Sequence, residues 1–263
     1  MIMSDAGILG KVPHAFGILR LYRRPWIRML EYWGVLPAGK TYRVGLRNDV
    51  RFHVRPGTGD LPIIDEVFIH RVYDSALTRI GQGEQVIDIG ANIGVFAIAA
   101  AARGAHVVCF EPLRDNFDLL LSNIRLNGLE ERISVHRLAV AGSAGEIELH
   151  VIGDRGASTA FPSIHPTWSA RPYVTRMKAE CTTLGDILRL NGIDECDCLK
   201  IDCEGAEYEI FASAEENTLR RVKCIIMEYH PNGQIADIGR RLEKLQFDVE
   251  VAPKRSVMFA WRR

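Results

Sequence analysis

The sequence lacks an excess of charge of either sign. Its 263 residues contain 33 Lys and Arg and 33 Asp and Glu, giving a formal net charge of +0. This balance gives no support to a nucleic-acid or membrane partner. The charge is uneven along the chain, since residues 1–59 contain ten basic and three acidic residues, a net +7. The remainder therefore carries about −7.

Cysteine is scarce. Six cysteines in a chain of this length do not indicate a disulfide scaffold. Cys109, Cys203 and Cys224 lie in or beside apolar, strand-like runs where a reduced thiol packs well. Cys196 and Cys198 form a C-x-C pair, but no second pair or histidine cluster completes a structural zinc site. We therefore expect a reducing compartment and no metal.

Long apolar runs are also missing. Lys11, Pro13 and His14 interrupt the apolar residues of the N-terminus, so neither a signal-peptide core nor a transmembrane segment is expected. We expect a cytoplasmic protein. Hydrophobic residues make up 47% of the chain, enough to bury a substantial core.

The first 59 residues predict a helical flap and a hairpin. In "HAFGILRLYRRPWIRMLEYW", residues 14–33, Pro25 divides the segment into two short helices. Phe16, Leu19, Trp26 and Leu30 are expected to pack on the main domain, while a membrane-surface or acidic-partner role stays open. Apolar residues then alternate on both sides of Asn48-Asp49 over residues 42–54, which is typical of a hairpin.

Residues 60–263 predict a second domain of α/β class. Helices are expected at about 62–80, 93–103, 114–126, 183–190, 205–213 and 233–245, and strands at 85–89, 106–110, 133–138, 146–152, 197–201 and 223–228. The chain closes with a hairpin of 247–251 and 257–261. This order predicts a mostly parallel sheet, covered on both faces, with an antiparallel edge. Residues 152–175 contain three prolines and predict a long loop that acts as a lid.

A glycine turn follows the first parallel strand in "VIDIGANIGVFAIAAA", residues 86–101. Asp88, Gly90, Asn92 and Gly94 fall on it, and the spacing is G-x-x-x-G rather than the dinucleotide pattern G-x-G-x-x-G. An acidic residue here would repel a pyrophosphate and suits a cationic ligand such as S-adenosylmethionine (SAM). Glu111, 21 residues after Gly90, can accept hydrogen bonds from both ribose hydroxyls.

Each of these residues also has a purely structural interpretation. Gly90 and Gly94 could permit close packing of helix and strand, and Asp88 could be a buried cap. The combination of the two acids with the glycine pair favours cofactor binding, and SAM over NAD.

The chain resembles the FkbM family of class I SAM-dependent methyltransferases. The resemblance covers roughly residues 41–263 and is carried by the glycine turn with "FEPLRDNFDLLLSNIRLNGL", "TTLGDIL", "LKIDCEGAEYEIF" and "IIMEYHP". It implies a Rossmann-like, seven-stranded sheet. It also implies O-methylation of a hydroxyl on a sugar or a polyketide-like natural product. The implied cofactor-binding residues are Asp88, Gly90, Ala91, Asn92, Gly94, Glu111 and Pro112.

Two groups of acids and a histidine follow later strands. Asp202, Glu204 and Glu207 come after residues 197–201, and Glu228 and His230 come at the end of 223–228. An alcohol acceptor must lose its proton during methyl transfer, which requires a carboxylate or imidazole within hydrogen-bonding distance. Our hypothesis is that Asp202 or His230 accepts this proton while Glu228 orients its neighbour, with Glu204 as a further catalytic candidate.

Structural interpretations of this group remain open. Asp202 could cap a helix, Glu204 and Glu207 could favour its dipole, and His230 could belong to a turn. Lys200 is next to the acids in sequence, but strand alternation points it away from the face of Ile201, so it need not be their partner.

The segment before the first parallel strand adds three weaker candidates. Asp60 is expected to cap a helix. A contribution of Asp60, Glu66 or Tyr73 to the amino-acid end of the cofactor is suggested only by the resemblance.

The sequence therefore favours a SAM-dependent methyltransferase with a small-molecule or glycan hydroxyl as acceptor and no nucleic-acid partner. An RNA methyltransferase and a non-catalytic SAM-binding protein remain alternatives, and a dehydrogenase is a distant third. The arginines of residues 1–59 are spread along the chain without a recognisable RNA-binding module, which argues against RNA. The oligomeric state stays open.

Overall fold

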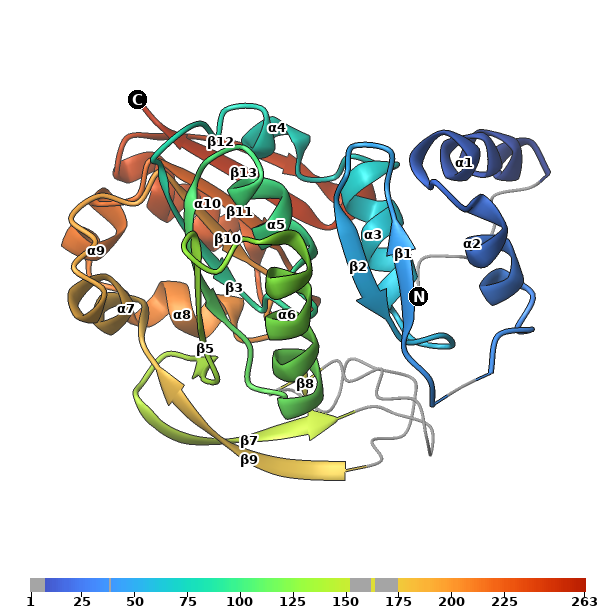
Figure 1. The fold of residues 1–263 in the computed structure, drawn as a ribbon. Coiled ribbons are helices and arrows are strands. Elements are labelled where there is room, and N and C mark those ends of the chain that lie inside the picture. Colours follow the sequence, from blue (N-terminus) through green and yellow to red (C-terminus); the bar gives the residue numbers. More distant parts are fainter. Residues whose placement is uncertain (1–7, 38, 152–161, 164–174) are drawn as a thin grey trace.

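A seven-stranded sheet forms the centre of the molecule in the computed structural model, which describes residues 8–37, 39–151, 162–163 and 175–263 (Figure 1). In spatial order its strands are β12 (Phe247–Ala252), β13 (Val257–Arg262), β11 (Cys224–Glu228), β10 (Cys198–Ile201), β3 (Gln85–Ile89), β4 (His106–Phe110) and β5 (Ile133–His136). The five strands from β11 to β5 are parallel, and β13 is antiparallel to both β11 and β12. The expected Rossmann-like class I methyltransferase fold is confirmed.

The strand order reverses beside β3. The chain proceeds outward from β3 to β4 and β5, and then returns to the other side of β3 to form β10 and β11. Ligands of open α/β sheets bind beyond the carboxyl ends of the strands at such a switch point. The loops after β3, β4, β10 and β11 therefore border the expected site.

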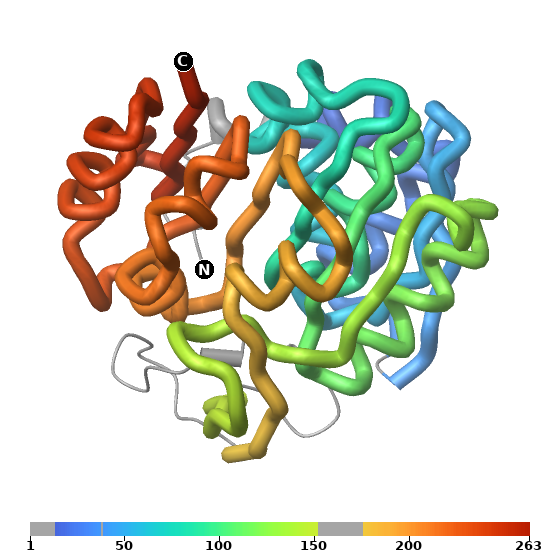
Figure 2. Tube along the Cα trace, turned by 90° about the vertical axis from the view of Figure 1, so that its left-hand side faces the viewer, coloured from blue at the N-terminus to red at the C-terminus, as the bar shows by residue number. Residues whose placement is uncertain are grey.

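Alternate residues of the strands are buried in two separate cores, one on each face of the sheet. Val86 of β3 packs with α3 (Asp60–Phe68), α5 (Val95–Ala101) and α6 (Arg114–Asn127). Ile87 and Ile89 pack on the opposite face with α7 (Leu184–Leu190), α8 (Glu207–Ser213), α9 (Glu216–Arg220) and α10 (Ile235–Lys244). Figures 1 and 2 show the N-terminal elements on one side of the molecule and the C-terminal helices on the other. Even-numbered residues of β3 and β10 thus share the α5 face.

The single helix expected at 62–80 is wrong. The structure has α3, which ends at Phe68, and a separate short helix α4 (Asp74–Leu77). The amides of Ile69 and His70 both donate to the carbonyl of Asp65, and Arg71 adopts a left-handed φ of 56°. A left-handed residue cannot continue a right-handed helix, so the chain turns at Arg71.

A second sheet lies below the first in Figure 1. Its strands, in spatial order, are β6 (Ala139–Val140), β9 (Thr175–Thr182), β7 (Gly145–Val151) and β8 (Pro162–Ser163). The strand expected at 146–152 belongs to this sheet as β7, while β9 and the helix α9 were not predicted. Residues 152–161 and 164–174, which make up most of the expected lid, lie outside the described residues.

The N-terminal elements are α1 (Ile8–Leu21), α2 (Pro25–Tyr32) and the hairpin of β1 (Tyr42–Gly45) and β2 (Arg51–Val54). Pro25 is the first residue of α2, as its position in the sequence predicts. The expected packing face is wrong, because Phe16, Leu19 and Trp26 are about half exposed. Leu30 is only partly buried.

The buried face of α1 and α2 contains polar anchors. The Tyr22 hydroxyl donates to Asp65 of α3 at 2.7 Å, and Arg28 Nε donates to the same carboxylate at 2.8 Å. Ile18 and Ile27 are buried beside them. These two hydrogen bonds fix the helices to α3 with the opposite face inward.

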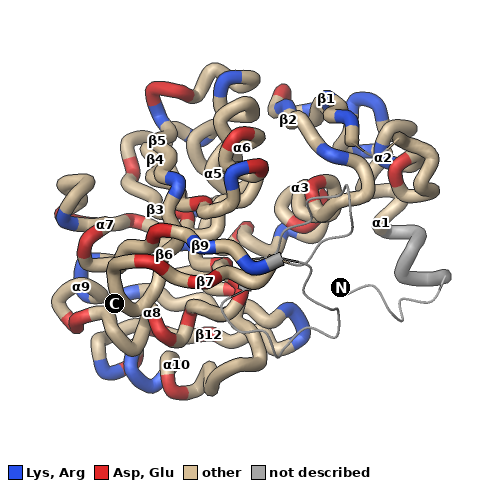
Figure 3. Tube along the Cα trace, turned by 90° about the horizontal axis from the view of Figure 1, so that it is seen from below, with Lys and Arg blue, Asp and Glu red and all other residues tan. Residues whose placement is uncertain are grey.

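Buried residues on both sides of the expected domain boundary at 59/60 belong to one continuous cluster, and the boundary itself stays a prediction. Among the described helices, none is long and apolar enough to cross a bilayer. Basic residues occur at separate places on α2, β1 and β2 (Figure 3).

Candidate functional site

The glycine turn after β3 brings the ends of two strands into backbone contact. Gly90 has a left-handed φ of 75°, and a Cβ atom at this position would lie 1.8 Å from the carbonyl oxygen of Asp202. The Asp202 amide donates to the carbonyl of Ile89 at 3.0 Å, and the amides of Gly90 and Ala91 donate to Phe110. Only glycine fits at position 90, and the turn is thereby fixed against both β10 and β4.

The second half of the turn is linked to Glu111, at the end of β4. The Asn92 amide donates to Glu111 Oε2 at 2.9 Å, and the Leu113 amide donates to Oε1 at 3.0 Å. Gly94, with a φ of 87°, then starts α5. Burial raises the pKa of Glu111 to about 7, although these hydrogen bonds act to lower it. The carboxyl group of Glu111 is thus buried and held in one orientation. Ala91 and Pro112 are the chain neighbours of the residues that make these contacts.

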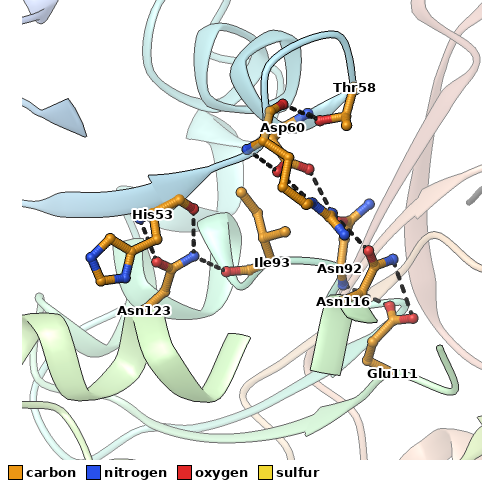
Figure 4. A network of polar contacts seen from close by, with 9 residues as sticks. His53, Thr58, Asp60, Asn92, Ile93, Glu111, Asn116 and Asn123 are labelled. Atoms are coloured by element: carbon orange, nitrogen blue, oxygen red, sulfur yellow. Dashed lines mark hydrogen bonds and ion pairs between the residues drawn. The ribbon is translucent and has the colours of Figure 1, made fainter. Parts of the chain in front are cut away.

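A chain of polar side chains connects Glu111 to the N-terminal hairpin (Figure 4). Asn116 Nδ2 lies 3.5 Å from Glu111 Oε1, and Arg55 Nη2 donates to Asn116 Oδ1 at 2.8 Å. Arg55 also forms an ion pair with Asp60 at 2.8 Å. The cofactor edge of the sheet and the hairpin are therefore linked by hydrogen bonds.

The expected capping role of Asp60 is wrong. Its carboxylate accepts hydrogen bonds from the backbone amide and guanidinium of Arg55, and its own amide donates to the Thr58 hydroxyl at 3.1 Å. Asp60 is 2% exposed. It pairs with the partly buried Arg55, which lies at the end of the hairpin and turns its guanidinium toward the start of α3.

Lys200 was underestimated by the sequence analysis. It lies directly opposite Asp88 in the β10–β3 register, and its Nζ is 3.2 Å from Asp88 and 3.5 Å from Asp202. Nζ also donates to the Gly90 carbonyl at 2.9 Å. Because residues 200 and 202 have the same parity, strand alternation itself places them on one face. Burial acts to lower the pKa of Lys200, but the two carboxylates outweigh it and raise that pKa.

The four residues expected to take part in catalysis lie together. We call Asp202, Glu204, Glu228 and His230 the acceptor cluster. Ligand atoms of Asp202, Glu228 and His230 lie within 4.8 Å of one another. His230 Nε2 is 3.1 Å from Glu204 Oε2, and His230 Nδ1 is 2.9 Å from Glu207 Oε1. The loops after β10 and β11 thus form one polar group at the switch point.

The two ring nitrogens of His230 determine its protonation. Burial acts to lower the pKa of His230, but Glu204 and Glu207 outweigh this effect and raise it to about 11. His230 is therefore an imidazolium at neutral pH. Burial and, second, the charge of Asp202 raise the pKa of Glu228 to about 9. The carboxyl group of Glu228 therefore holds a proton at neutral pH.

Two residues of the N-terminal half border the acceptor cluster. Burial and the charge of Asp202 raise the pKa of Glu66, on α3, to about 7. Burial and the same charge raise the pKa of Tyr73 well above its usual value. From the sequence, both residues were expected to contribute only weakly to binding of the cofactor. Their signal was the resemblance of residues 47–74 to the family, which does not indicate that they approach Asp202.

The residues around the glycine turn fit SAM. Both carboxylate oxygens of Asp88 are buried, and the Lys200 ammonium lies 3.2 Å from one of them. Glu111 presents a second carboxyl at the neighbouring strand end, and Gly90 has no side chain to fill the turn. A ligand with a sulfonium and an ammonium group suits this negative edge better than a pyrophosphate does.

Comparison with known proteins agrees with this chemistry. A family model for the methyltransferase FkbM domain matches residues 88–249. The methyltransferase sdnD of Sordaria araneosa is 27% identical, over 76% of this chain and 89% of its own length. The 31-O-demethyl-FK506 methyltransferase FkbM of Streptomyces tacrolimicus is 26% identical, over 75% of this chain and 85% of its own length.

A solved structure shares the fold. The SAM-dependent methyltransferase of Agrobacterium tumefaciens superimposes with a TM-score of 0.51 at 12% identity, over 87% of this chain and 72% of that chain. With the glycine turn, the two strand-end carboxyls and a family model that spans most of the sheet, the chain belongs to the FkbM methyltransferase family and uses SAM as its cofactor.

Proposed function

We propose that this methyltransferase modifies a hydroxyl group on a natural-product small molecule or a sugar. The observation that carries the proposal is the acceptor cluster, which gathers three carboxyl groups and a histidine beside the glycine turn. An alcohol is a poor nucleophile until its proton is removed, and this cluster supplies groups that can remove it.

The cofactor side of the proposal rests on the glycine turn. The residues that would hold SAM are Asp88, Gly90, Ala91, Asn92, Gly94, Glu111 and Pro112. Glu111 would accept hydrogen bonds from the ribose hydroxyls, since its carboxyl is oriented by two backbone amides. When bound, SAM supplies an electrophilic methyl group on its sulfonium.

Within the acceptor cluster, the geometry favours Asp202 as the base. His230 already holds protons on both ring nitrogens, and Glu228 is protonated at neutral pH. Asp202 keeps 26% of its side chain exposed and lies 3.5 Å from the Lys200 ammonium. We therefore propose that Asp202 accepts the hydroxyl proton, while Glu204 and His230 orient it and Glu228 shapes the acceptor side.

The relatives support oxygen as the acceptor atom. The name of the Streptomyces protein describes methylation at an oxygen of a natural product. That protein and this chain align over most of both lengths. The inference concerns the acceptor atom and its chemical class, and the particular molecule is to be found by experiment.

The test is an acceptor screen with SAM carrying a 13C-labelled methyl group. Polyketide-like alcohols and glycosides are incubated with the purified protein, and S-adenosylhomocysteine and labelled product are measured by mass spectrometry. The carbon chemical shift distinguishes an O-methyl from an N-methyl product. We expect an O-methyl signal with at least one hydroxyl acceptor.

Three results would contradict the proposal. Labelling on nitrogen would exclude O-methylation. Tight, salt-sensitive binding and methylation of RNA would establish the RNA alternative. Stoichiometric SAM binding without turnover on any acceptor of the screen would favour a non-catalytic SAM-binding protein.

A further inference from the structure

We propose that Asp202, Glu228 and His230, together with Glu204, bind a divalent cation of the Mg2+ and Mn2+ class. The ligand atoms of the first three residues lie within 4.8 Å of one another, and Glu204 Oε2 lies 3.1 Å from the His230 ring. The four side chains come from the loops after β10 and β11. They face the same switch point as the glycine turn.

The spacing of these atoms fits one ion. Mg2+ binds oxygen at about 2.1 Å with near-octahedral geometry, which places neighbouring ligand atoms about 3 Å apart and opposite ones about 4 Å apart. The observed upper spacing of 4.8 Å needs side-chain movements of under about 1 Å to reach this geometry. Rotation of the carboxyl groups of Asp202 and Glu228 provides such movements.

His230 is held in the orientation of a metal ligand. Its Nδ1 lies 2.9 Å from Glu207, whose side chain is completely buried. Metal-binding histidines commonly donate their other N–H to a carboxylate, which fixes the ring and its tautomer. With Nδ1 held by Glu207, Nε2 is the atom that faces the carboxyl groups of the acceptor cluster.

The charges of the acceptor cluster favour a bound cation. Glu204 Oε2 is buried and lies 3.1 Å from His230 Nε2, its charged partner. The side chains of Asp202, Glu204 and Glu228 converge on His230 Nε2, and an ion bound there would displace the protons that Nε2 and Glu228 hold. Lys200 approaches Asp202 from the β3 side and is shared with Asp88. A divalent ion would interact with all three carboxyl groups at once.

The donor set indicates the class of metal. Three carboxylates and one imidazole provide hard oxygen ligands with a single nitrogen, which suits Mg2+ and Mn2+. Structural zinc sites use four cysteine or histidine ligands, and this cluster contains no thiolate. Mn2+ is the better probe, since it tolerates imidazole and is paramagnetic.

The ion would act on the acceptor. A divalent cation that contacts a hydroxyl oxygen lowers the pKa of that hydroxyl and fixes its position. This role rests on the proposed O-methylation, whereas binding of the ion does not. The acceptor hydroxyl would then give up its proton more readily to the carboxylate of Asp202.

Mn2+ binding is measured directly by electron paramagnetic resonance, without acceptor or SAM. We expect the wild-type chain to remove one equivalent of free Mn2+ signal, and excess Mg2+ to compete. Glu228→Gln and His230→Ala should each weaken binding by at least about 10-fold. Glu216→Gln, on the exposed surface of α9, is the matched control and should bind as the wild type does. Circular dichroism checks that each variant is folded.

Absence of a wild-type site, or equal Mn2+ affinity in the wild type and folded Glu228→Gln, would overturn the proposal. The acceptor screen separates this failure from failure of the proposed function. O-methylation that persists undiminished in a chelator overturns the ion and leaves the function intact. Mn2+ binding with methyl transfer only to nitrogen leaves the ion site intact and overturns the function.

Discussion

The glycine turn and the acceptor cluster are neighbours whose carboxyl groups are stabilised in different ways. In the turn, each carboxyl oxygen of Glu111 accepts a backbone N–H, so its charge is stabilised by fixed dipoles. In the acceptor cluster, carboxyl groups of Asp202, Glu204 and Glu228 face each other and one histidine. In the glycine turn, backbone amides orient the carboxyl group before any ligand binds. In the acceptor cluster, protons or added cations must reduce the repulsion between the carboxyl groups.

Lys200 connects the two regions. Its ammonium lies between Asp88, below the glycine turn, and Asp202, in the acceptor cluster. A single buried cation thus neutralises part of each. The following variants are designed to affect one region without the other, or to remove this connection.

The largest effect is expected from Asp202→Asn. The amide cannot accept the hydroxyl proton, so turnover should fall by about 10²–10⁴-fold, the usual contribution of a general base. The affinity for SAM should change by no more than a few-fold, because the glycine turn keeps its contacts. Turnover is measured as S-adenosylhomocysteine release, and SAM affinity by calorimetry.

Asp237→Asn is the control for this variant, since Asp237 is an exposed residue of α10 paired with Arg240. It should behave as the wild type. Unchanged turnover in Asp202→Asn would show that the base is elsewhere.

The next effect is expected from Lys200→Met, which removes the connection. Asp88 and Asp202 lose their shared cation, and breaking the buried pair with Asp88 costs about 3–5 kcal/mol of unfolding free energy. Urea denaturation measures the loss. Lys223→Met is the control, because Lys223 is half-exposed and surface pairs contribute less than about 1 kcal/mol. Equal losses in the two variants would contradict a structural role of the buried ion pair.

A smaller effect concerns the pH dependence of SAM binding. Burial raises the pKa of Glu111 to about 7, so below that pH the folded protein holds a proton that must leave before the carboxylate can accept ribose hydroxyls. SAM affinity, measured by calorimetry at several pH values, should fall up to about 10-fold per pH unit below 7. Glu111→Gln should bind more weakly and without this dependence.

The same pKa has a consequence for stability. Between the unfolded pKa near 4.5 and the folded value near 7, the folded state binds more protons than the unfolded state. This group therefore makes the unfolding free energy decrease as pH rises through that window.

For the binding prediction, a SAM affinity that is flat between pH 6 and 8 would refute the assignment of Glu111.

The smallest effect is expected from Asn116→Leu, which breaks the polar chain between Glu111 and Arg55. The contact of Asn116 with Glu111 is long, at 3.5 Å, so SAM affinity should fall only about 3–10-fold, near 1 kcal/mol. Calorimetry compares this variant with Asn191→Leu. Asn191 contacts the end of α7, and its loss should leave SAM affinity unchanged. Equal SAM affinities in the two variants would show that the polar chain does not support the cofactor side.

Local patterns explain how much of the fold could be predicted. The glycine turn, the strands β3 and β4, and the end of α6 at Gly128 depend on residues that are close in sequence. The break at Pro25 has the same origin. These features were predicted because turn and cap chemistry acts within a few residues.

Features that depend on neighbouring elements were missed. Lys200 and Asp88 are 112 residues apart and meet only because β10 pairs with β3 in that register. On α1, apolar residues occur on both faces, so periodicity alone could not choose Ile18 over Phe16. The hydrogen bonds that Asp65 accepts from Tyr22 and Arg28 determine which face of the helices is buried.

The catalytic candidates show the same limit. The sequence predicted that one edge of the sheet holds Asp202, Glu204, Glu228 and His230, since the ends of parallel strands meet there. It could not assign a base, because protonation of His230 depends on two glutamates that hold both ring nitrogens.

The close approach of Gly90 to the carbonyl of Asp202 restricts how this enzyme can evolve. Any side chain at position 90 would displace the backbone of residue 202, so a mutation in the glycine turn also moves Asp202, the proposed base. Directed evolution toward new acceptors therefore has more freedom in segments that do not touch either position. Libraries built there would change substrate preference while the donor turn is inherited intact.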